Sequence, residues 1–171
     1  MKSAKIFYSH EFPETPISGW AGARWNGWVR ENTPSGQPMN PRRVVHPFLS
    51  QRKIWYLLDV HFNGVDLLFA TPLELDQFIA VMSQKILPSG WALVPGRPLG
   101  RPSNHWLSRL PKEAKSWKFR QAICKFLQEA DTVKRFRNRY ASQPVKLHFD
   151  GVYNNYYNAR SWPADRRLNG G

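Results

Sequence analysis

The sequence predicts an α+β protein: a mostly antiparallel sheet built from two hairpins, helices packed on one face, and an irregular Trp/Gly/Pro-rich N-terminal segment. Two pairs of short, strand-like runs are each joined by a two-residue turn signal, Asn63-Gly64 and Asp150-Gly151. Between them, apolar residues recur at helical spacing over residues 72–86 and 112–133. Strands therefore do not alternate regularly with helices, which favours α+β over a doubly wound fold.

The length and composition favour a single domain. The chain has 171 residues, of which 42% are hydrophobic, so it can form a core. We expect residues 1–50 to form the irregular N-terminal segment packed on the core, residues 51–160 the α+β core, and residues 161–171 a loose C-terminal tail. The single cysteine, Cys124, excludes an intramolecular disulfide and a zinc site built from several cysteines.

The N-terminal half contains one clear hairpin. Residues 5–9 predict a short strand, whereas residues 19–41 are rich in Gly, Pro and Trp and predict a loop. Residues 54–62 and 65–70 flank Asn63-Gly64, which suits a type I′ turn. This turn sets Phe62 beside Val65 and His61 opposite Asp66.

A helix is predicted directly after the hairpin. Thr71 and Glu74 form a capping box, with proline at the first helical position. The apolar stripe of this helix comprises Leu75, Phe78, Ile79, Met82 and Ile86. Residues 88–90 end the helix, residues 91–94 predict a strand, and residues 95–102 predict a rigid basic loop.

The C-terminal half predicts two helices and a hairpin. A short helix is expected over residues 104–110 and a longer one from Lys112 to about Val133, beyond which the apolar periodicity degrades into an arginine-rich run. Residues 145–157 predict the second hairpin, turning at Asp150-Gly151.

The charge balance predicts an anionic partner. The chain has 25 Lys and Arg against 12 Asp and Glu, a net charge of +13. Nucleic acid is the commonest polyanion that such a protein meets. No apolar run is long enough to cross a bilayer, and the first residues, MKSAKIFYSHEF, contain no apolar signal core, so we expect a cytoplasmic protein without a membrane partner. No phosphate loop, dinucleotide fingerprint or metal-binding motif is present, so neither a cofactor nor a metal is expected.

The candidate binding residues are cations grouped around one tryptophan. Trp117 lies opposite the apolar stripe of its helix, where an exposed ring could stack on bases while cations hold phosphates. The alternative is that Trp117 packs under the N-terminal segment, and that the arginine-rich run is a solvated helix end. The candidate nucleic-acid-binding residues are Arg97, Arg101, Lys112, Lys115, Trp117, Lys118, Arg120, Lys125, Lys134, Arg135, Arg137 and Arg139.

Three functions remain open at this stage. The first is non-enzymatic binding of single-stranded or structured DNA or RNA, by electrostatic attraction and aromatic stacking. The second is an adaptor or inhibitor subunit that binds an acidic protein partner or a nucleoprotein complex. The third, less favoured, is a metal-dependent nuclease or hydrolase using Asp59, His61 and Asp66, which the hairpin brings together; a solvent-facing charge pair is the simpler interpretation of these residues.

Overall fold

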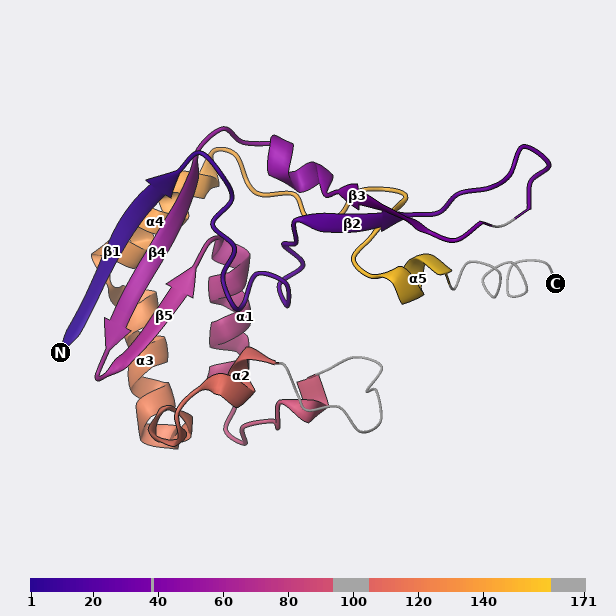
Figure 1. Ribbon diagram of the computed structural model, residues 1–171. Coiled ribbons are helices and arrows are strands. Elements are labelled where there is room, and N and C mark those ends of the chain that lie inside the picture. The colour runs from indigo at the N-terminus through magenta and orange to yellow at the C-terminus, as the bar shows by residue number, and fades with distance from the viewer. Residues whose placement is uncertain (38, 94–104, 161–171) are drawn as a thin grey trace. The chain divides into compact units, whose positions relative to one another are not determined.

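The chain forms two compact units, each assembled from separate stretches of sequence (Figure 1). The computed structural model describes residues 1–37, 39–93 and 105–160. Unit 1 comprises residues 1–21 and 54–144, and unit 2 comprises residues 22–53 and 145–171. Each unit contains a three-stranded antiparallel sheet with helices, which confirms the predicted α+β class.

The sheet of unit 1 has the strand order β1-β4-β5, formed by Lys2–Ser9, Trp55–Phe62 and Val65–Phe69. The predicted turn joins β4 to β5: Asn63 and Gly64 adopt φ values of 47° and 86°, as a type I′ turn requires. The pairing of Phe62 with Val65 and of His61 with Asp66 is confirmed. The short-range turn chemistry therefore sets the register of the whole hairpin.

Among the described residues, helices cover one face of this sheet. Leu58, Val60 and Phe62 are fully buried on that face, and α3 and α4 lie behind β1 and β4 (Figure 1). On the opposite face Lys5 of β1 lies beside Asp59 of β4 and is exposed.

Helix α1, Pro72–Met82, begins at the predicted capping box. The Thr71 side chain accepts a hydrogen bond from the Glu74 amide, and the Glu74 carboxylate accepts one from the Thr71 amide. Leu75, Phe78 and Met82 are buried as predicted. Ile86 is not part of the stripe: the helix ends at Met82, and the Ile86 side chain is 85% exposed.

The long helix predicted from Lys112 to about Val133 is three separate pieces. A 3₁₀ helix, η3 (Lys112–Lys115), precedes α3 (Trp117–Glu129), and α4 (Asp131–Ala141) follows. The breaks are at Ser116, whose side chain caps α3, and at Ala130, where a ψ of 128° interrupts the helical backbone. The prediction that apolar periodicity ends near Val133 is wrong.

Helix α4 carries its own apolar stripe within the arginine-rich run. Val133, Phe136 and Tyr140 are buried at helical spacing. The Tyr140 hydroxyl donates to the Ala70 carbonyl at 2.7 Å and accepts from the Tyr56 amide at 3.0 Å. This hydroxyl thereby joins α4 to the beginning of β4 and to the residue that follows β5, at the end of the hairpin opposite its turn.

Two further short elements complete unit 1. Helix α2 spans Trp106–Arg109, within the range predicted for it. The strand predicted over residues 91–94 is wrong: Trp91–Leu93 form a 3₁₀ helix, η2, because the Ala92 amide bonds back to the carbonyl and side chain of Ser89. The predicted basic loop over residues 95–102, with Arg97 and Arg101, and the predicted C-terminal tail both lie entirely outside the described residues.

Unit 2 contains a smaller sheet with the order β3-β2-β6, formed by Arg42–Val45, Asn26–Val29 and Val152–Tyr153. A 3₁₀ helix, η1 (Pro47–Ser50), and helix α5 (Tyr156–Arg160) complete it. The second predicted hairpin is present only in part, because residues 145–149 form no strand and β6 pairs with β2 instead.

Across the three described stretches of the chain, no helix has both the length and the apolar character needed to pass through a membrane.

Candidate nucleic-acid interface

Helix α3 has sharply separated inner and outer sides. On the inner side, the rings of Phe119 and Phe126 each lie 5.4 Å from the ring of Phe62 in β4. The outer side carries Lys118 and Lys125, both exposed and seven residues apart. Seven residues are about two turns, so the two ammonium groups are carried on the same side of the helix about 10 Å apart along its axis.

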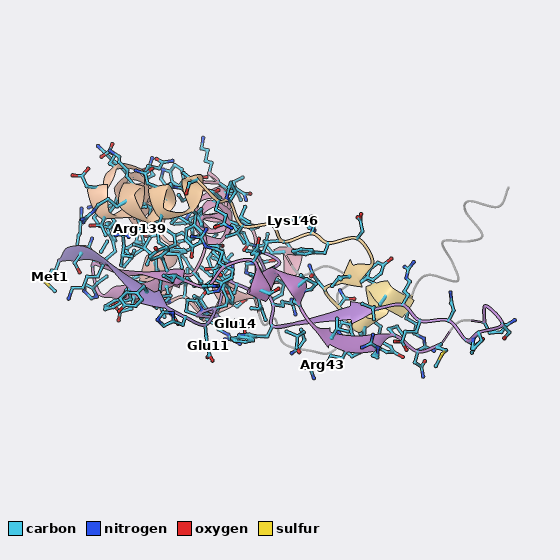
Figure 2. The ribbon with its side chains drawn as sticks, turned by 90° about the horizontal axis from the view of Figure 1, so that it is seen from above. Met1, Glu11, Glu14, Arg43, Arg139 and Lys146 are labelled. Atoms are coloured by element: carbon cyan, nitrogen blue, oxygen red, sulfur yellow. The ribbon has the colours of Figure 1, made fainter. Side chains whose placement is uncertain are left out.

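Helix α4 is arranged in the same way. Its buried stripe packs toward the sheet, whereas Lys134 and Arg135 are exposed on the opposite side. The view from above shows both helices on one side of the sheet, with side chains projecting from their outer surface (Figure 2). The outer cations of α3 and α4 therefore belong to one side of unit 1.

We define the α3–α4 cationic surface as the outer cations of α3 and α4, together with Trp117 and the two lysines of η3, the element that directly precedes α3: Lys112, Lys115, Trp117, Lys118, Lys125, Lys134 and Arg135. Lys115 is half-buried and the other cations are exposed. Three exposed carboxylates, on Glu113, Glu129 and Asp131, lie within the same helices. The cations outnumber them, so the surface attracts anions at ordinary salt.

Trp117 lies at the first position of α3, and its side chain is 41% exposed. One neighbour of the indole is the Arg120 guanidinium, whose central carbon lies 5.0 Å from the ring centroid. This cation–π contact restricts the motion of the ring while much of its surface remains open to solvent. The exposure expected of a stacking platform is therefore met at Trp117.

Arg120 itself is not available to a ligand, contrary to its inclusion among the predicted binding residues. Its side chain is 4% exposed. The guanidinium donates to the carbonyls of Lys115 at 3.0 Å and Met82 at 3.2 Å, and also to that of Gln84. Arg120 therefore joins the end of α1 to the beginning of α3, because these orphan carbonyls need donors.

The arginine-rich run does not form one continuous row of free cations. Arg137 makes a 2.8 Å ion pair with Asp76 of α1, and the Arg139 guanidinium lies 5.1 Å from the ring centroid of Tyr56. Helical geometry distributes the run around α4: Lys134 and Arg135 project from the outer side, whereas Arg139, although exposed, lies over the Tyr56 ring. Arg97 and Arg101 lie outside the described residues.

The hairpin residues considered for catalysis form one pair rather than a cluster. His61 Nδ1 lies 2.6 Å from Asp66 Oδ1, as the register predicted. Asp59 lies beside Lys5 and Leu68 in the sheet. Within residues 1–37, 39–93 and 105–160, no group of three His, Cys, Asp or Glu side chains could hold a metal ion. This geometry gives the hydrolase hypothesis no support.

Two histidines and the cysteine also have shifted pKa values, and each of them contributes to packing or helix capping rather than to a candidate site. Burial lowers the pKa of His46 and of His105, and the neutral Nδ1 of each ring accepts a hydrogen bond from the backbone at the start of a helix, from Phe48 and Leu107 respectively. Burial raises the pKa of the Cys124 thiol, against the opposing effect of nearby Arg120, so Cys124 is not an activated nucleophile.

Sequence reasoning missed an aromatic–cationic cluster in unit 2. Arg30 lies over the ring of Tyr153 at 4.4 Å and donates to the carbonyls of Asn158 and Ala159. Trp28 makes an edge contact of 5.2 Å with Tyr156. The signal in the sequence was the density of aromatic residues, but the partners lie more than a hundred residues apart. Because Arg30 is engaged by backbone carbonyls, this cluster stabilises unit 2.

Comparison with known proteins adds no assignment. No protein family, curated protein or solved structure matches the chain. The functional assignment therefore rests on the α3–α4 cationic surface.

Proposed function

We propose that the protein binds single-stranded or structured nucleic acid, without catalysing a reaction on it, through the α3–α4 cationic surface. The observation that carries the proposal is the exposed indole of Trp117, at the start of the helix that carries Lys118 and Lys125. Lysines bind phosphates as point charges, and base stacking on an aromatic ring is tolerant of sequence. Together these groups suit a flexible strand whose bases are unpaired.

Two features favour an unpaired strand over a duplex. A ring stacks only on a base that is exposed, and the bases of a duplex stack on one another. In addition, the described chain contains no helix-turn-helix and no zinc-binding cluster that would place a helix in the major groove. We therefore expect unpaired strands to bind more tightly than duplex of the same length.

The test is a salt titration of binding with a matched pair of double variants. A fluorescein-labelled ~20-nucleotide oligothymidine is titrated with the full chain between about 50 and 200 mM salt, and anisotropy gives the affinity. Lys118→Gln with Lys125→Gln removes two phosphate contacts, so the slope of log K against log salt falls by about 1.4. The control pair, Lys5→Gln with Lys53→Gln, lowers the net charge equally but lies outside the surface.

A second variant tests stacking separately from charge. Trp117→Leu leaves every cation in place, so the salt slope is unchanged while affinity for the oligothymidine falls on the order of tenfold. If the two double lysine variants lost affinity equally, binding would depend on the total charge of the protein rather than on the position of the lysines, and the proposed surface would be overturned. Undetectable binding of single strands at about 50 mM salt would overturn nucleic-acid binding altogether.

A further inference from the structure

A second surface of unit 1 lies along β5, at the margin of the sheet on the side of α1 (Figure 1). A pocket of about 240 Å³ borders this strand. Its lining comprises residues 66–68 of β5 together with Pro16, Ile17, Trp106, Arg109 and Leu110. The lining is mostly apolar, and its volume suits one side chain of a larger molecule more closely than a whole cofactor.

The backbone of β5, which borders this pocket, has hydrogen-bonding groups along its outer edge that no described residue uses. In a hairpin with a two-residue turn, the flanking pair, here Phe62 and Val65, exchanges hydrogen bonds, and the pairs then alternate. Val65, Leu67 and Phe69 therefore bond to β4. Asp66 and Leu68 direct their amides and carbonyls away from β4, toward the open edge, and no described backbone group bonds to them there.

Within the described residues, this edge carries little of the charge that commonly protects an exposed edge strand from pairing. The other edge strand, β1, carries two lysines, Lys2 and Lys5, which discourage pairing with a further strand. The only charged residue in β5 is Asp66, and its carboxylate is already hydrogen-bonded to His61. The β5 edge is therefore the one suited to accept another strand.

Two donors at the pocket have no partner among the described residues. Trp106 is 4% exposed, and its indole N–H makes no hydrogen bond in the part of the chain that the structure describes. A buried unpaired donor is costly, so such a group commonly indicates a missing acceptor. Arg109, in the same lining, is exposed and forms neither an ion pair nor a hydrogen bond with any described residue. Asp66 of the same lining already accepts a hydrogen bond from His61, whereas Arg109 has no partner among the described residues, so the group at this pocket that is available to a ligand is a cation, which favours an acceptor bearing negative charge.

We propose that the β5 edge binds an extended peptide segment of a partner protein, which adds a strand beside Asp66 and Leu68, seats one apolar side chain in the pocket and places a carboxylate near Arg109. Strand addition supplies affinity through the main chain, and a pocket for an alternate side chain supplies selectivity. The proposal is independent of the α3–α4 cationic surface, because none of its residues belongs to that surface.

The test uses the full chain and an array of random hexapeptides, each synthesised with a free C-terminal carboxylate and as the amide. Leu68→Pro is the blocking variant: the amide it removes points away from β4, so the hairpin is preserved while the added strand loses a donor. Leu68→Thr is its matched control, which shortens the apolar side chain but keeps the amide. Arg109→Gln removes the cation alone.

We expect peptides with an apolar residue flanked by extended-chain formers to bind wild type and Leu68→Thr, and to bind Leu68→Pro on the order of tenfold more weakly. We expect Arg109→Gln to weaken the free acids on the order of tenfold while sparing the amides. In hydrogen exchange of the wild-type complex, the Asp66 and Leu68 amides become protected, a readout that needs no variant. The proposal would be overturned if peptides bound but left these two amides unprotected. It would also be overturned if no peptide of the array bound wild type more tightly than it bound Leu68→Pro.

Discussion

The buried carboxyl of Glu74 makes stability depend on pH in a direction opposite to that of most acidic groups. Glu74 is fully buried at the start of α1, where Ser18, Thr15 and the amides of Ala70 and Thr71 donate to it. Burial outweighs these hydrogen bonds and raises the pKa of Glu74 from 4.5 to about 7. The folded chain therefore holds a proton on Glu74 that the unfolded chain releases above pH 4.5.

The sign and size follow from proton linkage. Below about pH 4.5 both states are protonated, and the group does not alter the unfolding free energy. Between about 4.5 and 7 the unfolded state is increasingly favoured because it ionises first, so stability falls as pH rises and then levels off. One pKa unit corresponds to ~1.36 kcal/mol, so the loss is about 3 kcal/mol in total.

Urea unfolding of wild type and Glu74→Gln across this range isolates the effect. Glutamine resembles the protonated acid, and every other carboxyl titrates equally in both proteins, so their difference in unfolding free energy reports Glu74 alone. We expect wild type to lose about 3 kcal/mol relative to Glu74→Gln from pH 4.5 to 7.5. Glu129→Gln, at an exposed site on α3, is the control and should give a constant difference. If the stability of wild type relative to Glu74→Gln stayed constant or rose with pH, the reasoning would be refuted, because the donors would then stabilise the carboxylate at least as much as burial disfavours it.

Three other substitutions or reactions test the packing. Tyr140→Phe leaves the Tyr56 amide without its acceptor and should lower the unfolding free energy by about 1–3 kcal/mol in urea titrations; an unchanged midpoint would contradict this. Gly27→Ala places a methyl group 2.6 Å from the Val152 side chain, so thermal unfolding should show a loss of about 1–3 kcal/mol, and a stabilised variant would disprove the close approach. The thiol of Cys124 should react slowly with a disulfide reagent in the native state and rapidly in denaturing urea; fast native labelling would show that it is not buried.

The parts of the fold that were predicted correctly depend on residues close together in the chain. The type I′ turn needs two positive φ values, and Asn63-Gly64 supplies them whatever surrounds the hairpin. The capping box of α1 and the apolar stripe of α3 likewise involve residues three or four positions apart. Helical spacing placed Trp117 opposite the apolar stripe but left open whether it packs under the N-terminal segment, and in the structure it is 41% exposed.

The failed predictions depend on partners that are distant in sequence. Residues 145–149 have strand-like composition, but β6 pairs with β2, more than a hundred residues earlier, and leaves them without a partner. Arg120 belongs to a cationic helix by sequence, yet carbonyls at the end of α1 bury it. The apolar stripe of α4 was not recognised in the sequence, because its buried residues alternate with lysine and arginine. Which of these residues face solvent is settled only when the helix packs on the sheet.

By itself, the sequence determined the excess of positive charge, the α+β class, the Asn63-Gly64 turn and the start of α1, because these depend on composition or on interactions between residues close together in the chain. Only the tertiary structure decided which cations remain free, which carboxyl is buried and which strand edge stays open. Those properties are set by desolvation and by competition for hydrogen-bond partners, and both depend on residues that folding brings together from distant parts of the chain.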